Sequence, residues 1–70
     1  MGDPRKALGR TIRERRQRLG LTQEELAEKA DLHWTYVSGV ERGVYNVSIV
    51  KLYRIAIALK TRIRDLVEQI

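Results

Sequence analysis

Residues 33 to 43, HWTYVSGVERG, gather hydroxyl groups, aromatic rings and an arginine within about three helical turns. Residues three and four positions apart share one side of a helix. The side expected to face outward carries small and polar residues, namely Thr35, Ser38, Gly39 and Arg42. The opposite side carries Val37, Val40 and Glu41. Hydroxyls and a guanidinium can form hydrogen bonds with a partner, so this side is a candidate recognition surface, whereas the opposite side is expected to face the core.

Groups able to catalyse a reaction or hold a metal are scarce in this chain. His33 is the one histidine, and there is no cysteine. No histidine–carboxylate–nucleophile set and no glycine-rich phosphate loop is visible. A metal needs several ligands close together, so His33 is not expected to bind one. A chain of 70 residues also offers little volume for a substrate pocket of ~300 Å³. We predict no enzyme activity, no metal and no cofactor.

The charge is basic and unevenly distributed. The net charge is +5 and the pI about 10.1; residues 1–20 carry +5, residues 21–41 carry −4 and the remainder carries +4. This favours a polyanionic partner, either nucleic acid or an anionic membrane surface, over a merely solvated charged face. No apolar run approaches the ~20 residues of a membrane span, and the N-terminus does not resemble a signal peptide. We expect a soluble cytoplasmic protein without membrane attachment.

Capping signals divide the sequence into helices, and no strand pattern competes with them. The first helix is expected to begin at Asp3-Pro4 and to stop at Gly20. Thr22 to Glu25 fit a capping box for a second helix, followed by a short connection at residues 30–33. The third helix ends at Gly43. Ser48 and Thr61 are the expected caps of the fourth and fifth. We predict an all-α fold, a compact five-helix bundle forming one domain over residues 1–70.

The last two predicted helices carry more apolar surface than so small a domain can hide. The fourth is apolar around most of its circumference, which is typical of a helix buried on several sides. The fifth, at about residues 61–70, has an apolar stripe. These features favour a two-fold homodimer over a stripe that only closes the chain's own core. The expected interface comprises Val50, Tyr53, Ile57, Ile63, Leu66, Val67 and Ile70.

Two short helices with a tight connection, the second exposing small polar groups, form a helix-turn-helix arrangement. The stretch LGLTQEELAEKADLHWTYVSGVERG, followed by NVS and IVKLYRIAIAL, resembles the phage-repressor-like (Cro/C1, XRE) helix-turn-helix family. The resemblance extends from about Leu8 to Leu66, and it is carried by an ordered set of markers rather than by any one of them. Within this family the chain looks most similar to the controller proteins of restriction-modification systems.

This resemblance implies the roles of particular residues. The expected DNA-binding residues are Gln23, His33, Trp34, Thr35, Tyr36, Ser38, Gly39, Arg42, Tyr45 and Asn46. Gln23 would contact a phosphate at a helix N-terminus, and a missing side chain at Gly39 would let the third helix approach DNA closely. Arg16 and Glu41 would form a structural ion pair, because a buried unpaired charge is costly.

Some of these roles have open alternatives. Trp34 departs from the family pattern, in which a basic residue is common. It fits either a contact with sugar or a thymine methyl, or a partly buried core position. Tyr36 is expected to contact phosphate through its hydroxyl rather than to lie in the core, and His33 to cap the third helix or touch the DNA backbone. Asn46 could instead only shape its turn.

The sequence therefore predicts a sequence-specific transcriptional regulator that binds a pseudo-palindromic operator in double-stranded DNA as a homodimer. A controller of a restriction-modification system is the favoured type, with RNA polymerase as a further candidate partner. One alternative is an antitoxin that represses a toxin-antitoxin operon. The other, from a different class, is a helical adaptor that binds a protein or anionic lipid.

Overall fold

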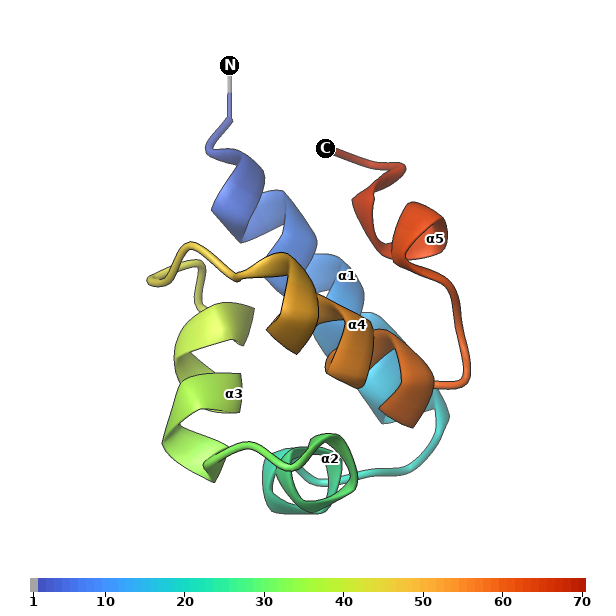
Figure 1. Cartoon of the computed structure of the whole chain (residues 1–70). Helices are drawn as coiled ribbons and strands as arrows, with labels where there is room; N and C mark the ends of the chain where they lie inside the picture. The colour runs from blue at the N-terminus through green and yellow to red at the C-terminus, as the bar shows by residue number, and fades with distance from the viewer. Residues whose placement is uncertain (1) are drawn as a thin grey trace.

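The computed structural model describes residues 2–70 and contains, within that range, five helices and no strands. In chain order they are α1 (Pro4–Arg18), α2 (Gln23–Ala30), α3 (Trp34–Glu41), α4 (Ile49–Ala58) and α5 (Ile63–Val67). α3 packs against α1 and α2, α4 packs against α2 and α5, and α5 also contacts α1 (Figure 1). The predicted all-α, five-helix fold is confirmed.

Side-chain caps begin α1, α2 and α4 as their sequences predict. Asp3 Oδ1 accepts a hydrogen bond of 2.9 Å from the Arg5 amide, with proline at the first helical position. Thr22 Oγ1 accepts from the Glu25 amide at 3.0 Å, and the Glu25 carboxylate accepts from the Thr22 amide at 2.8 Å. Ser48 Oγ accepts from the amide three residues further on at 3.2 Å. Each cap satisfies an amide that has no partner inside its helix.

The ends of the first three helices use left-handed backbone conformations. Gly20 and Gly43 have φ of 70° and 76°, which glycine adopts without steric cost, and they stop α1 and α3 as predicted. Asp31 takes φ 56° after α2, and the Leu32 amide then donates 2.9 Å to the Ala27 carbonyl. The connection between α2 and α3 is therefore tight, and it fixes the two helices as a pair.

The start of α5 differs from the prediction that Thr61 caps it. The helix begins at Ile63, and the Thr61 hydroxyl donates to Asp65 Oδ2 at 3.2 Å. The same carboxylate oxygen accepts from the Arg62 amide at 3.4 Å. Asp65, three residues into the segment, therefore supplies the acceptor, because an acidic side chain can reach back to an amide at the helix start.

All five helices contribute to one core. Its largest fully buried side chains are Ile12, Leu26, Val37, Val40, Ile55 and Leu66. The prediction that Leu66 offers surface to a dimer interface is wrong, because its side chain is fully buried in its own chain. Ile63 is partly buried and packs against the same core, so it adds little free surface.

The prediction that α4 is buried on several sides is also wrong for the single chain. Leu52, Ile55, Ala56 and Ala58 face the core. The other side of α4 leaves four large apolar side chains exposed: Ile49 66%, Val50 59%, Tyr53 58% and Ile57 57%. We call these four residues the α4 apolar face. A surface of this kind is typical of an interaction site.

Gly9 is a close-approach position inside α1. A Cβ on Gly9 would lie 2.5 Å from the Glu41 carbonyl oxygen and 2.8 Å from the carbonyl carbon, and would also overlap the Val40 carbonyl oxygen. These are backbone atoms, so they cannot rotate away. The missing side chain therefore lets α1 lie directly on the end of α3 and sets the position of that helix.

We expect Gly9→Ala to lower the free energy of unfolding by about 1–3 kcal/mol. Alanine is a better helix former than glycine by about 1 kcal/mol, and this preference alone would stabilise the variant. A loss of stability would therefore show that the overlap with the α3 backbone outweighs helix propensity. Urea unfolding followed by circular dichroism measures it, with Arg10→Ala, at an exposed neighbouring position, as the control. A stabilised Gly9→Ala protein would show that α1 and the end of α3 can move apart without a cost in free energy.

Candidate nucleic-acid interface

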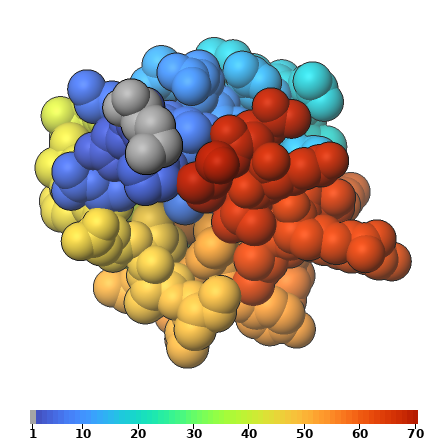
Figure 2. Space-filling model, turned by 90° about the horizontal axis from the view of Figure 1, so that it is seen from above, coloured from blue at the N-terminus to red at the C-terminus, as the bar shows by residue number. Residues whose placement is uncertain are grey.

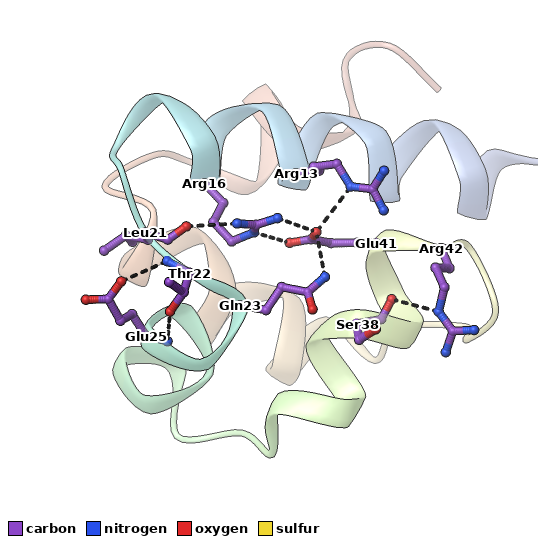
Figure 3. Close-up of polar contacts among 9 residues, drawn as sticks. All are labelled: Arg13, Arg16, Leu21, Thr22, Gln23, Glu25, Ser38, Glu41 and Arg42. Atoms are coloured by element: carbon purple, nitrogen blue, oxygen red, sulfur yellow. Dashed lines mark hydrogen bonds and ion pairs between the residues drawn. The ribbon is translucent and has the colours of Figure 1, made fainter.

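A buried charge network holds the C-terminal end of α3. Arg16 Nε donates to Glu41 Oε2 at 2.7 Å, and the terminal Arg16 nitrogen Nη2 donates to Oε1 at 3.0 Å. Arg16 Nη1 also donates to the Leu21 carbonyl at 2.8 Å. Figure 3 shows this arginine lying between α1, the segment before α2, and α3. The predicted Arg16–Glu41 ion pair is present, and it joins three parts of the fold through a bidentate geometry.

Glu41 has two further partners. Gln23 Nε2 donates to Glu41 Oε1 at 3.1 Å from the first residue of α2, and Arg13 Nε donates to the same oxygen at 3.4 Å. Burial alone would raise the pKa of the Glu41 carboxyl, but hydrogen bonds from Arg16, Gln23 and Arg13 outweigh it and hold that pKa below its ordinary value. The carboxylate is therefore ionised at neutral pH. Gln23, expected to contact phosphate, uses one side-chain donor inside the protein.

The exposed side of α3 carries the small polar groups that the sequence places there. Thr35 and Trp34 are exposed, and Ser38 is half-buried. Arg42, directly after the helix, is exposed, and its Nε donates to the Ser38 carbonyl at 3.4 Å. These four residues follow one another along the helix from its first residue to its C-terminal cap. They form a surface that offers two hydroxyls, a methyl, an indole and a guanidinium.

His33 caps the N-terminus of α3, as one of its predicted roles requires. The Thr35 amide donates to His33 Nδ1 at 3.2 Å, and the Thr35 hydroxyl lies 2.7 Å from the same nitrogen. The imidazole also stacks on the indole of Trp34, with ring centroids 6.1 Å apart and planes inclined by 28°.

Gly39 does not lie on the outward face, and this corrects the prediction that it lets DNA approach. It is buried, and a Cβ added to it would overlap the ring of Tyr45. Tyr45 stacks in turn on Tyr36, with centroids 5.2 Å apart and planes inclined by 11°. The glycine therefore makes room for an aromatic ring of the same chain, and this packing fixes the loop after α3 against the helix.

The sequence predicts a phosphate contact for the Tyr36 hydroxyl rather than a place in the core. Its ring is partly buried and packs against the core. Burial, and secondarily the neighbouring Tyr45, raise the pKa of the Tyr36 hydroxyl, so at neutral pH this group is protonated and able to donate a hydrogen bond. Lys51 Nζ lies 4.5 Å from the centroid of the Tyr36 ring, within the range of a cation–π contact. Asn46 is exposed in the loop between α3 and α4.

Sequence reasoning missed that several basic residues border this surface. Lys51 comes from the first turn of α4, where the sequence shows only an outward-facing position. From α1, Arg5 Nη1 donates to the Val44 carbonyl at 3.5 Å, and Lys6 lies beside Gly43. Helical spacing cannot indicate these contacts, since they join α1 to a loop about 38 positions away in sequence. Lys6 brings positive charge beside Gly43, whereas the charge of Arg5 is paired with Asp3, whose Oδ2 lies 2.8 Å from Arg5 Nη2.

Trp34 is not part of the core, which removes one of its two predicted roles. Its side chain is 49% exposed at the first position of α3.

Among the residues described, no group of three or more His, Cys, Asp or Glu could hold a metal ion. In the same range, no helix has the length and apolar character needed to cross a membrane.

A helix-turn-helix family model matches residues 12–66 of the chain. The chain belongs to the helix-turn-helix family. It is 39% identical over 61 residues to the control protein C.BamHI of Bacillus amyloliquefaciens. The aligned segment covers 86% of this chain and 75% of that protein. The predicted resemblance to Cro/C1-type regulators, and to restriction-modification controllers among them, is thus confirmed.

Solved structures give the same result for this helix-turn-helix protein. The restriction-modification controller C.AhdI from Aeromonas hydrophila matches with a TM-score of 0.87 and 44% identity, covering 89% of this chain and 94% of that one. The biofilm regulator SinR, solved in complex with DNA, matches with a TM-score of 0.81 and 33% identity over 84% of this chain and 95% of that one. The protein is a helix-turn-helix transcriptional regulator, and α3 corresponds to the recognition helix of such proteins.

Proposed function

We propose that this protein binds a pseudo-palindromic operator as a homodimer and regulates transcription as a controller of a restriction-modification system. The observation that carries the proposal is the exposed polar face of α3, held in place by the buried Arg16–Glu41 pair. A wide major groove admits such a helix and presents a different pattern of donors and acceptors for each base pair. The whole chain would act as one DNA-binding domain.

The α4 apolar face supports the dimer. With Val67 and Ile70, which are 36% and 54% exposed, it supplies apolar surface that a second copy would cover. A two-fold dimer would present two recognition helices about one DNA turn, ~34 Å, apart. Bound to a promoter, such a dimer would lie beside RNA polymerase, which we infer as a further partner in the cytoplasm of its host.

Two alternatives are separable by experiment. An antitoxin would bind its own operator and also a toxin protein, so the DNA interface alone does not distinguish it from a controller. A helical adaptor would use its basic surface only for attraction to a protein or anionic lipid. Such an adaptor would lose function when the α4 apolar face changes, and would be insensitive to changes at Thr35 or Ser38.

Selection of the purified protein on a randomised duplex DNA library at physiological salt tests the proposal. Recovery of a palindrome with half-sites one helical turn apart is the expected result. Weak, steeply salt-dependent binding without any sequence preference would contradict it and favour the adaptor. A search with the recovered operator near genes of restriction-modification or toxin systems would then separate the two kinds of regulator.

Arg42→Ala is expected to weaken binding to operator and to unrelated DNA by similar factors. Arg42 is exposed after α3 and is proposed to contact a phosphate, which is common to every sequence. Losing one such contact should reduce the slope of log K against log salt by about 1. Titrations at several salt concentrations measure this slope, with Arg18→Ala on the exposed part of α1 as the control. An unchanged slope would remove Arg42 from the interface.

Thr35→Ala is expected to relax base preference at one position of each half-site, at a cost of about 1 kcal/mol in discrimination, the typical net contribution of one hydrogen bond. Its hydroxyl and methyl are exposed on α3, where base edges are proposed to lie. Repeating the DNA selection with this variant measures the change. The loss should be confined to that position, because the phosphate contacts remain. A consensus identical to that of the unaltered protein would show that Thr35 does not contact bases.

A further inference from the structure

Trp34 presents an unusual group at the start of the recognition helix. It is the chain's one tryptophan and the first residue of α3, and nearly half of its side chain is exposed. An indole offers a single N–H donor and no acceptor. It cannot make the paired hydrogen bonds by which arginine recognises guanine. What the exposed ring offers is a broad apolar surface.

The orientation of this indole is restricted before any ligand binds. It stacks on the imidazole of His33, whose Nδ1 accepts a hydrogen bond from the Thr35 amide. The imidazole therefore cannot rotate without breaking the cap of α3. Aromatic pairs with centroids 4.5–7 Å apart attract one another, and the observed separation is 6.1 Å. The indole of Trp34 is therefore already held in one orientation, and little conformational entropy is lost when a ligand covers it.

The chemistry of the major groove identifies what such a ring can contact. Recognition helices contact base edges through their N-terminal residues. Almost every group on those edges is a hydrogen-bond donor or acceptor, and the apolar exception is the methyl on C5 of thymine. 5-Methylcytosine carries the same methyl at the same place. A polar edge placed against the indole would lose its water without gaining a partner.

We propose that Trp34 recognises a pyrimidine 5-methyl group in each operator half-site. The proposal rests on the proposed function, because it requires α3 to lie in the major groove. Covering one methyl with the indole is expected to strengthen binding about fourfold per half-site. A symmetric operator would gain roughly fifteenfold, since the two half-sites are far enough apart for their effects to multiply.

The experiment uses the full-length protein and the operator recovered by selection. Each thymine is replaced in turn by deoxyuridine, which removes only the methyl. At the sensitive position, duplexes carrying cytosine and 5-methylcytosine are then compared. The same titrations are made with Trp34→Ala and with Thr35→Ala, because the threonine methyl is the other apolar group close by. Fluorescence of Trp34 provides a second signal, since a covered indole emits at shorter wavelength.

The expected result is one position per half-site where deoxyuridine weakens binding about fourfold and reduces the fluorescence shift. That sensitivity should persist in Thr35→Ala and vanish in Trp34→Ala. If only the thymine methyl strengthens binding, Trp34 recognises thymine. If 5-methylcytosine also binds more tightly than cytosine by a similar factor, Trp34 recognises the methyl group of either base.

Other results overturn the proposal. If a palindromic operator is selected but no methyl matters, or if the methyl effect survives in Trp34→Ala, the inference is wrong while the proposed function stands. If no operator is selected at all, the proposed function fails and the inference fails with it. The selection and the methyl comparison therefore separate the two failures.

Discussion

Replacing Glu41 with alanine is expected to lower the free energy of unfolding by about 3–5 kcal/mol. The carboxylate side chain is fully buried, and it accepts hydrogen bonds from Arg16, Gln23 and Arg13. Its removal leaves Arg16, whose side chain is only 12% exposed, without its ionic partner. Domains of this size have little stability to lose, so most molecules should unfold in mild urea. Circular dichroism during urea titration measures the change.

Arg13→Ala is the matched control for this network. Arg13 contacts the same carboxylate but is 45% exposed, so water can replace its contact. Exposed ion pairs contribute about 0–1 kcal/mol. A second test replaces both buried charges, as Arg16→Met with Glu41→Leu. This variant should be more stable than Glu41→Ala, because no unpaired charge stays buried. Equal losses for Arg13→Ala and Glu41→Ala would contradict the role assigned to the buried pair.

The same carboxylate should make stability depend on acid pH. The pKa of Glu41 is held below the ordinary value of 4.5. A carboxyl whose pKa is lowered in the folded state contributes stability that is present above 4.5 and is lost as the pH falls through the folded-state value. Asp3 and Glu25, whose pKa values are lowered by their hydrogen bonds with Arg5 and Thr22, act in the same direction. The difference between wild type and Glu41→Gln therefore isolates the contribution of Glu41.

Local signals in the sequence were enough to predict the helices, but not the buried pair. Caps such as Thr22 with Glu25, and stops such as Gly20, act through neighbouring residues, so their chemistry can be recognised within a few positions. The Arg16–Glu41 pair lies 25 positions apart. Its prediction depended on the family pattern and on the rule that a charge on a buried helix face needs a partner.

Predictions failed where packing between distant segments decides the outcome. Gly39 has the spacing of an exposed residue, yet Tyr45 folds back over it. Leu66 shares a stripe with exposed residues but is fully buried, because α5 is short and rests on α1 and α4. Gly9 gave no signal at all, since its importance comes from carbonyl groups at the end of α3. Helical periodicity gives the direction of a side chain, and only the assembled fold shows what covers it.

Ile57→Lys is expected to abolish the dimer and to weaken operator binding roughly 10³-fold or more, towards the affinity for unrelated DNA. Ile57 is 57% exposed on the α4 apolar face, where Val50 and Tyr53 precede it at helical spacing. In a two-fold dimer both copies would carry this lysine in the interface. Each charge would then lie next to the lysine of the other copy or against apolar groups, and both arrangements are unfavourable. The single chain should still fold, because this side chain is outside the core.

The choice of lysine makes the DNA measurement decisive. An added positive charge can only increase general attraction to phosphates, so a loss of operator affinity must come from the broken dimer. Leu19→Lys adds the same charge at another exposed apolar position, 43% exposed at the end of α1, and should leave dimer and operator binding intact. Analytical ultracentrifugation gives the oligomeric state, and titration with operator gives the affinity. A monomeric Ile57→Lys protein that still binds its full operator tightly would show that each recognition helix acts alone, and the α4 apolar face would then need another partner.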